Sequence, residues 1–394
     1  RMTQFVHDEN KERLVIELGA DPNDEALRHR REAYERVDQF SAQWVTSLPF
    51  PADYLAPREY REVVARYMGL PSPACAGIAG HPIDRGGGVL DPWGFRLLCA
   101  NLPGDGWRRQ HNAFQDAVLR AHRLAGIEAH MEVSTLFLGA MGPAAHARWV
   151  SAPEALKRNL VPDFLARWPR TADGAADDLG GEELGEIKTI QPGPTRYGGP
   201  RGSERNGAVN RRAAGVQADY DAKARAADIR LNGCGAPHIT ACRNAGCGCG
   251  DNVGPIRRVL RGYKLKGYAV GAYGECSDTV HTLVRRLGRA GVAKWARLLP
   301  TASEHGAQGR LTWLLKRNIA MANLRAMART LLDRLEHVGT GAAGRTARRA
   351  AHRARTARAT AEEARHQHAA YRQSDHSGAG SRGGFWESGA GDGG

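Results

Sequence analysis

The sequence lacks several features that would assign a protein quickly to a large class. No apolar run is long enough to span a bilayer, which argues against a membrane partner. There is no secretory signal, and the seven cysteines are an odd number, so free thiols in a reducing compartment are favoured over disulfides. The phosphate-cradling loop Gly-x-x-x-x-Gly-Lys is also missing, which gives no reason to expect nucleotide chemistry. We therefore expect an intracellular protein that does not bind membranes.

Lysine is scarce as well, and arginine supplies most of the 56 basic residues. The net charge of +14 and the isoelectric point near 9.8 indicate an acidic polymer as partner. Arginine suits such a partner because its planar guanidinium makes paired contacts with phosphate and stacks on bases. A GC-rich coding sequence, which favours Arg, Ala and Gly codons, is the alternative explanation. We expect a nucleic-acid partner, with DNA favoured and RNA as the alternative.

The most informative pattern joins two short segments near the middle of the chain. Pro162-Asp163 is followed, 23 residues after the aspartate, by Glu186-Ile187-Lys188. Two carboxylates can hold a divalent metal, and a nearby lysine can orient water or stabilise a developing negative charge. This combination is the minimum equipment for hydrolysing a phosphodiester. The alternative is a turn aspartate and a solvated Glu–Lys pair on an edge strand, which would contribute little to stability.

Periodicity around this pattern predicts alternating helices and strands. Helices are predicted over 112–125, 213–229 and 278–287, and strands over 127–137, 160–168, 184–190 and 268–273. The order is therefore helix, three strands, helix, strand, and then a further helix. Because side chains alternate along a strand, Glu186 and Lys188 are expected to share one face.

This element order and the Pro162-Asp163 and Glu186-x-Lys188 pattern together resemble the PD-(D/E)XK nuclease fold. The resemblance implies an α/β (α+β) core of helix, three strands, helix and strand, here with helical N- and C-terminal extensions. In that resemblance Asp163 and Glu186 would hold Mg²⁺ (or Mn²⁺), and Lys188 would be the catalytic lysine.

Further residues are similar to accessory positions of such nucleases. Glu132, on the first strand, would be an extra acid beside the metal. Gln217 and Tyr220 look like the polar positions that some of these nucleases place on the helix after the third strand. Lys223 lies one helical turn beyond Tyr220 and is expected to face the same way.

A second resemblance covers residues 40 to 290. A tryptophan–leucine–proline stretch, a helix with Arg, Leu and Gly, a cysteine/histidine cluster and a His-Asn pair follow one another at 44–49, 61–70, 75–99 and 111–112. This series is similar to the region downstream of the polymerase in non-LTR retrotransposon proteins, where it leads into a nuclease-like domain. The resemblance implies target-strand nicking during element insertion, and a nuclear location.

The Tyr-x-Asp-Asp signature of a polymerase is absent, and the chain opens with Arg1 rather than methionine. We therefore expect a fragment of a longer reading frame, with an upstream polymerase domain missing. The expected organisation is a helical linker (1–70), a Cys/His segment (71–111), a nuclease-like domain (112–300, with a Cys/Gly-rich insertion at 232–254), a C-terminal helix (301–340) and a basic arm with a disordered tail (341–394).

The first cysteine/histidine cluster departs from that family's pattern, which has two cysteines close together before a glycine/histidine run and a third cysteine. Cys75, His81, Cys99 and His111 would make a four-ligand site of sulfur and nitrogen, which suits Zn²⁺. Their spacing is irregular. The alternative is two buried cysteines and two surface histidines.

A denser cluster places Cys234, His238, Cys242, Cys247 and Cys249 within sixteen residues. Glycines between them permit tight turns, and the stretch has no apolar material for a core. A second Zn²⁺ would supply the ordering energy that is otherwise missing. Disulfides or a disordered glycine-rich insertion are the alternatives.

The sequence thus predicts a metal-dependent DNA endonuclease derived from a retroelement. One alternative is a non-catalytic, zinc-containing module that binds nucleic acid and whose carboxylates are structural. The other is a degenerate retroelement remnant with no selected activity. An enzyme needs Asp163, Glu186 and Lys188 close together, whereas a binding module does not.

Overall fold

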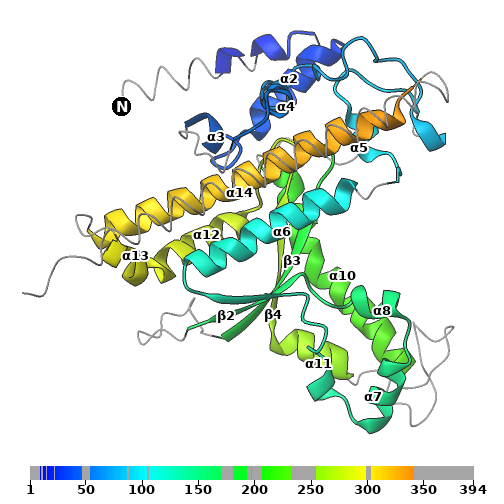
Figure 1. Cartoon of the computed structure of the whole chain (residues 1–394), viewed down its shortest axis with the longest axis vertical. Helices are drawn as coiled ribbons and strands as arrows, with labels where there is room; N and C mark the ends of the chain where they lie inside the picture. The colour runs from blue at the N-terminus through cyan, green and yellow to red at the C-terminus, as the bar shows by residue number, and fades with distance from the viewer. Residues whose placement is uncertain are drawn as a thin grey trace, which may run out of the picture.

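The protein has a mixed α/β fold built around one four-stranded sheet (Figure 1). The computed structural model describes residues 9, 12–14, 16–21, 23–46, 54–86, 88–103, 106–169, 181–192, 197, 206–231, 254–298 and 303–339. Within these residues, no helix combines the length and apolar character needed to cross a membrane.

The sheet contains strands in the order β1-β2-β3-β4. Their bounds are Glu128–Met131 (β1), Phe164–Trp168 (β2), Gly181–Thr189 (β3) and Lys264–Val270 (β4). The first three strands pair antiparallel, and β4 joins β3 in parallel. In that parallel pair Glu186 lies opposite Gly267. The chain must cross over the sheet to make this parallel pair, and a long helix supplies part of the crossover.

Helices supply the other layers. Their bounds are Glu25–Arg36 (α2), Gln43–Thr46 (α3), Pro57–Met68 (α4), Phe95–Cys99 (α5), Gly106–Leu124 (α6), Pro143–Val150 (α7), Glu154–Arg158 (α8), Gly207–Leu231 (α10), Pro255–Gly262 (α11), Asp278–Ala290 (α12), Val292–Leu298 (α13) and Glu304–Arg334 (α14). Short 3₁₀ turns lie at Asp84–Gly86 (η2), Leu138–Ala140 (η3) and Leu335–His337 (η5).

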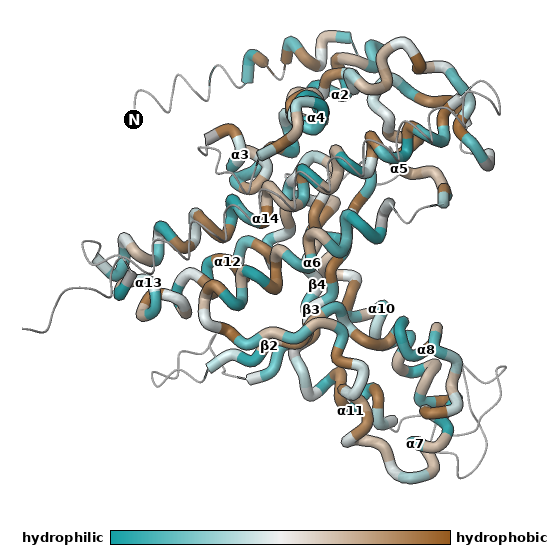
Figure 2. The backbone as a smooth tube through the Cα atoms, in the orientation of Figure 1, coloured by the Kyte–Doolittle hydropathy of each residue, from teal (hydrophilic) through white to brown (hydrophobic). Residues whose placement is uncertain are grey.

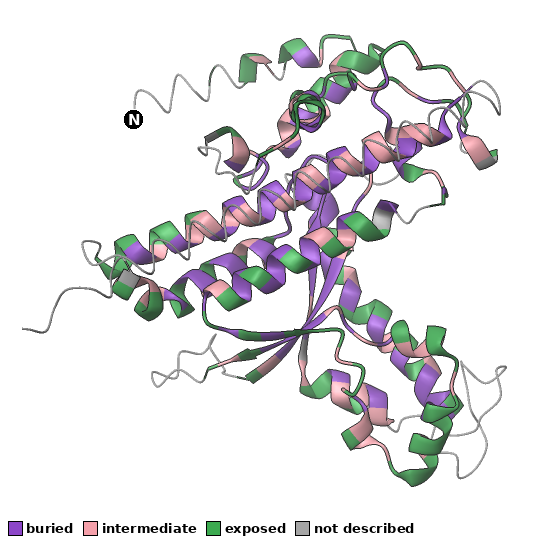
Figure 3. Ribbon diagram, viewed as in Figure 1, coloured by how far each residue is buried: buried purple, intermediate pink, exposed green. Residues whose placement is uncertain are grey.

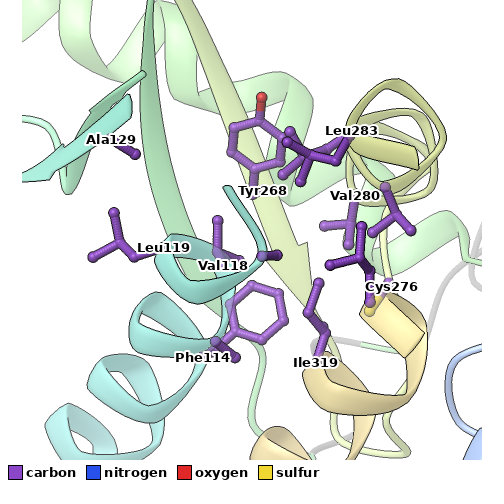
Figure 4. Close-up of a cluster of buried hydrophobic side chains, with 14 of the residues drawn as sticks. Phe114, Val118, Leu119, Ala129, Tyr268, Cys276, Val280, Leu283 and Ile319 are labelled. Carbon is purple, nitrogen blue, oxygen red and sulfur yellow. The ribbon is translucent and has the colours of Figure 1, made fainter. Parts of the chain in front are cut away.

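One face of the sheet is covered by α6, α12 and α14. Figure 4 shows Phe114 and Val118 of α6 and Leu283 of α12 converging on Tyr268 of β4. Ile319 brings the C-terminal helix α14 into the same core. Each such side chain contributes about 1.5–3 kcal/mol when it is removed from water. Figure 3 shows purple, buried stretches of ribbon in the sheet and in these helices.

The opposite face of the sheet packs against α10 and α11. Leu184 of β3 and Leu265 of β4 meet Val216 of α10 in a second apolar cluster. The helix can approach because β4 has no side chain at Gly267: a Cβ there would lie 2.3 Å from the carbonyl oxygen of Ala213. This close approach brings α10 over the part of β3 that carries Glu186.

Helices α3 and α4 rest on α14, whereas Ala33 of α2 packs in a cluster with Ala269 of β4. Val63 of α4 packs with Leu324 and Ala328 of α14 in a small cluster of its own. Helix α14 therefore has to be apolar on more than one side, and Figure 2 shows apolar and polar stretches mixed along its length.

The expected order of helix, three strands, helix and strand is present, but several bounds differ. The strand predicted over 127–137 is wrong beyond β1, because the chain turns at Glu132, which has a left-handed φ of 43°. The fourth strand begins at Lys264 and ends at Val270, earlier than the predicted 268–273. The helix predicted to begin at 112 already begins at Gly106, and a short helix, α11, precedes β4.

Candidate functional site

Asp163 is the last residue before β2, and three neighbouring segments hold it. Its side-chain Oδ2 accepts a hydrogen bond from the backbone N–H of Ile187 on β3, at 2.6 Å. Its carbonyl oxygen accepts hydrogen bonds from Gln115 Nε2 of α6 (2.7 Å) and from the backbone N–H of Glu132 (3.1 Å). The carboxylate is thereby fixed against the residue between Glu186 and Lys188.

Glu186 and Lys188 share the α10 face of β3, as their alternation predicted. The Lys188 ammonium donates to Glu186 Oε1, and the Tyr220 hydroxyl of α10 donates to Glu186 Oε2 at 2.6 Å. Burial and the charge of Asp163 raise the pKa of Glu186, and the contacts with Lys188 and Tyr220 offset only part of this rise. The structure therefore crowds two acids, a situation that a bound cation would relieve.

Tyr220 is nearly buried beneath this pair, with 2 % of its surface exposed. Burial and the neighbouring Glu186 carboxylate raise the pKa of the Tyr220 hydroxyl, so it remains a proton donor at neutral pH. Lys223 lies over the outer side of the ring, with its Nζ 4.7 Å from the ring centroid. Of the two predicted helix positions, Tyr220 reaches the site, whereas Gln217 is exposed on α10.

His111 of α6 completes the cluster. The sequence pattern predicted this histidine at a zinc site instead. Its Nε2 lies 3.1 Å from Asp163 Oδ2, and its Nδ1 lies 3.5 Å from Asn112 Oδ1. Burial lowers the pKa of His111, but the hydrogen bond and charge of Asp163 outweigh this effect and raise it overall. The four side chains of Asp163, Glu186, Lys188 and His111 are between 10 % and 18 % exposed, so solvent reaches them only partly.

The predicted zinc site of Cys75, His81, Cys99 and His111 is not assembled. Cys75 is buried among leucines, and burial raises the pKa of its thiol to about 11, so it is a poor source of the thiolate that zinc requires. The Cys99 thiol donates to the carbonyl oxygen of Pro192 at 2.9 Å. His111 faces Asp163 instead. Cys75, Cys99 and His111, which were expected to bind one zinc ion, therefore lie in three separate environments.

The second cluster, Cys234, His238, Cys242, Cys247 and Cys249, lies outside the described residues, and its zinc site stays a prediction. Glu132 lies next to the site through its backbone only. Its side chain is exposed, and the described residues include no hydrogen-bond or ion-pair partner for it. Among the described residues, no group of three or more His, Cys, Asp or Glu side chains is arranged to hold a metal ion.

Another acid of β3, Glu183, has a different role. It lies on the opposite face of the strand, where Lys266 Nζ (2.8 Å) and Arg286 Nη1 (2.7 Å) both contact its Oε2. The Tyr268 hydroxyl donates to its other oxygen. Burial acts to raise the pKa of Glu183, but these three partners lower it overall. Glu183 is thus fully paired inside the core, and Glu182 at the start of β3 pairs with Arg167, which leaves Glu186 as the acid of β3 that lies in the cluster.

Comparisons with family models, curated proteins and solved structures found no match for the chain. The chemistry must therefore be argued from the site itself. The structure brings the predicted residues Asp163, Glu186, Lys188 and Tyr220 together, and it adds His111 and Gln115, which the sequence pattern did not place here. These two residues are four apart on one helix, so helical periodicity already placed them on a common face. Nothing in the sequence showed that this face meets Asp163, which lies 52 residues beyond His111.

Proposed function

We propose that the protein is a metal-dependent nuclease with a PD-(D/E)XK-like core. The observation that carries the proposal is the hydrogen bond from the Ile187 N–H to Asp163 Oδ2. It closes the 23-residue separation of the motif and sets Asp163 beside the strand segment that carries Glu186 and Lys188. The alternative, a turn aspartate and a solvated Glu–Lys pair on an edge strand, fits less well, because β3 lies inside the sheet and the side chains of Asp163, Glu186 and Lys188 are only 10–18 % exposed.

The order of elements supports the same proposal. Helix α6 precedes strands β1 to β3, α10 follows them, and β4 then pairs parallel with β3. This is the order expected of that nuclease core. The present chain adds α7 and α8 between β1 and β2, and α11 before β4. These additions lie in connections, where insertions are tolerated, and they leave the paired ends of β2 and β3 intact.

The donor set suits Mg²⁺ or Mn²⁺. Mg²⁺ is commonly bound by one or two carboxylates together with water and substrate phosphates, which is what Asp163 and Glu186 can offer. Burial first, and then the charge of Asp163, raise the pKa of Glu186, and a bound cation would favour its charged form. When bound, a divalent cation supplies Lewis-acid polarisation of a phosphate oxygen.

The chain's own residues would perform the remaining tasks. Tyr220 and Lys188 each donate to one oxygen of Glu186, so they fix its orientation toward the substrate phosphate. The Lys188 ammonium can also stabilise negative charge that develops on the phosphate during attack by water. Asp163 is held by Ile187 and Gln115, so it is pre-organised rather than recruited by the substrate.

We further propose DNA as the substrate, cut by nicking of a target strand in the manner of a retroelement protein. The support is the net charge of +14 and the abundance of arginine, which favour a polyanion. An upstream polymerase domain, a nuclear location and RNA as an alternative substrate belong to the same proposal, and they rest on the resemblance of residues 40 to 290.

A plasmid-nicking assay tests the proposal. Supercoiled plasmid is incubated with Mg²⁺ or Mn²⁺ and the full chain, or with Asp163→Asn, Glu186→Gln or Lys188→Met. The parent is expected to produce nicked circles, and each substitution to reduce the rate at least about 100-fold, because each removes charge at the reacting phosphate. Lys294→Ala, an exposed lysine on α13, is the matched control and should nick like the parent.

Two other outcomes point to the alternatives. Salt-sensitive DNA binding without nicking, retained in all three variants, would favour a non-catalytic binding module. Failure of the parent to unfold cooperatively and to bind DNA would favour a degenerate remnant.

A further inference from the structure

A group of aromatic and basic side chains lies on the outside of α3 and α4, apart from the candidate nuclease site. We call it the α4 surface, and it consists of Trp44 of α3 and of Tyr60, Arg61, Tyr67 and Met68 of α4. Tyr60 and Met68 are 52 % and 49 % exposed. Because seven or eight residues make about two helical turns, Tyr60, Tyr67 and Met68 lie on one side of α4. Exposed apolar groups that adjoin charged residues mark interaction sites.

The aromatic rings of this surface are held in place by the protein. Trp44 packs against Val63 of α4 and Leu324 of α14, where these helices meet (Figure 1). Its ring centroid lies 5.9 Å from that of Tyr60 and 5.5 Å from that of Tyr67, and both pairs are T-shaped. In a T-shaped pair the edge of one ring meets the face of the other, so Trp44 covers at most one face of Tyr60. Tyr60 is therefore a supported ring that solvent still reaches.

The charges of α4 are separated by sign. Its two acids are buried and already have partners: Glu59 Oε1 accepts a hydrogen bond from Arg329 Nε at 2.7 Å, and Glu62 Oε2 accepts one from the Ser72 hydroxyl at 2.6 Å. Arg58 and Arg61, in contrast, are exposed. Among the residues that the structure describes, neither guanidinium has a hydrogen-bond or ion-pair partner. The charge that α4 presents to solvent beside its aromatic rings is therefore positive.

We propose that the α4 surface binds a single-stranded nucleic acid, with Tyr60 stacked on a base and Arg61 in contact with a backbone phosphate. Exposed aromatic rings beside positive charge are the combination that holds single strands, because an unpaired base offers its face for stacking. A duplex hides these faces between its base pairs. A second copy of this chain would bring the same positive charge to the surface, so charge complementarity favours the polyanion. The proposal requires no metal and does not depend on the proposed nuclease activity.

The test is fluorescence anisotropy of the full chain with a labelled oligodeoxythymidylate of about 12 nucleotides, within the usual range of site sizes. A duplex of the same length is titrated in parallel, and EDTA removes divalent metal so that no strand is cut. The variants are Tyr60→Ala, Tyr60→Phe and Arg61→Ala. The matched controls are Trp313→Ala on α14 and Arg297→Ala on α13, both exposed residues outside the α4 surface. Thermal unfolding checks that each variant folds.

Tyr60→Ala should weaken binding of the single strand about 5- to 100-fold, which corresponds to the loss of one stacked base. Tyr60→Phe keeps the ring and should stay within about twofold of the parent, as should Trp313→Ala. Duplex affinity should change less than about twofold in Tyr60→Ala, because a duplex offers no free base face. Arg61→Ala should weaken single-strand binding and reduce the slope of log affinity against log salt by about 1, whereas Arg297→Ala should leave that slope unchanged.

Other results overturn the inference and can be told apart from failure of the proposed function. Equal losses in Tyr60→Ala and Trp313→Ala, or equal losses for the single strand and the duplex, would show that Tyr60 does not stack on a base. No binding of the single strand by the parent would leave the α4 surface to a protein partner. Asp163→Asn should bind the oligonucleotide as the parent does, so loss of nicking in that variant would support the nuclease proposal whatever Tyr60→Ala shows.

Discussion

At the scale of single residues, the site depends on neutral donors as much as on charges. The Tyr220 hydroxyl contacts Glu186 Oε2 at 2.6 Å and lies under the carboxylate on the side facing α10. A buried carboxylate oxygen without such a donor is destabilising, because water cannot replace the lost hydrogen bond. Tyr220 therefore both orients Glu186 and makes its partial burial tolerable.

Tyr220→Phe should lower the free energy of unfolding by about 1–3 kcal/mol, which is the usual penalty for leaving a buried polar group unpaired. The pKa of Glu186 should rise further, because the tyrosine hydrogen bond acts to lower it. Chemical denaturation at neutral pH measures the first effect. Tyr60→Phe, on the exposed side of α4, is the control and should change stability little. Equal effects of the two substitutions would refute the role of Tyr220.

A second residue-scale feature is a buried acid away from the site. Glu275, in the turn after β4, is 1 % exposed and accepts hydrogen bonds from the Tyr197 hydroxyl (2.8 Å) and the Tyr273 N–H (3.0 Å). Burial raises the pKa of Glu275 to about 7; the Tyr197 hydrogen bond acts to lower it, and nearby Asp38 adds to the rise. The folded state therefore holds a proton on Glu275 that the unfolded chain releases at a lower pH.

The sign of the pH dependence follows from this difference. Between the ordinary pKa of 4.5 and about 7 the folded state binds more protons than the unfolded state, so stability falls as pH rises through this range. Deprotonation of Glu275 should lower the free energy of unfolding by about 3 kcal/mol by pH 8. Unfolding measured from pH 4.5 to 8 should show a smaller decline in Glu275→Gln than in the parent. Asp116→Asn, an exposed acid on α6, should decline as the parent does.

Residue types and spacing predict part of the candidate site but not all of it. The sequence could predict that Asp163, Glu186 and Lys188 lie together, because Glu186 and Lys188 share β3 and Asp163 directly precedes the neighbouring strand β2. The sequence predicts His111 at a zinc ion with Cys75, His81 and Cys99, because these four residues form a sulfur and nitrogen ligand set. Its actual partner is 52 residues away and is chosen by the packing of α6 on the sheet, which no local pattern contains.

At the scale of elements, the position of α10 decides whether the site exists. Gly267 of β4 lies opposite Glu186 in the parallel pair, and the backbone of α10 approaches it so closely that a Cβ there would meet the Ala213 carbonyl oxygen. Alternation and helical spacing predicted a helix and a strand here. They did not predict that the strand would begin at Lys264, because the register of a parallel pair is set by the packing of its crossover, not by the strand's own sequence.

Gly267→Ala should destabilise the protein by about 1–3 kcal/mol, the usual cost of overpacking. The added Cβ would lie 2.3 Å from the Ala213 carbonyl oxygen, a backbone atom that cannot move without shifting α10. The shift should also separate Tyr220 from Glu186 and reduce nicking. Gly215→Ala on the same helix is the matched control: nothing lies within 4 Å of its new Cβ. There, alanine should be neutral or stabilise the helix by up to about 1 kcal/mol.

At the scale of the whole molecule, helix α14 packs against segments that the sequence patterns place in different parts of the expected domain organisation. Helix α14 contributes Ile319 to the core under the sheet and Leu324 to the cluster with α4. Its Arg334 guanidinium reaches the carbonyl oxygens of Leu97 and Leu98 around α5. The boundaries expected at 70, 111 and 300 therefore fall between segments that share buried contacts with one helix. Those boundaries follow from resemblance and local sequence patterns, which do not record such long-range packing.

The net charge of +14 is also a property of the whole chain, and it yields the last prediction. If the charge serves a polyanionic partner, affinity for duplex DNA should fall by at least about 1,000-fold between 50 and 200 mM salt, as expected for six or more phosphate contacts. If it reflects codon bias alone, basic residues are scattered and fewer phosphates are contacted at once, so the fall should be much smaller. Fluorescence anisotropy with a labelled duplex measures the slope.

Asp163→Asn separates this binding from the chemistry. The substitution removes one negative charge and no basic residue. The dependence of DNA affinity on salt concentration should therefore match that of the parent, while nicking is lost. A slope that collapses in Asp163→Asn would mean that the carboxylate site, through its metal, supplies most of the binding energy. The basic residues would then contribute little to binding.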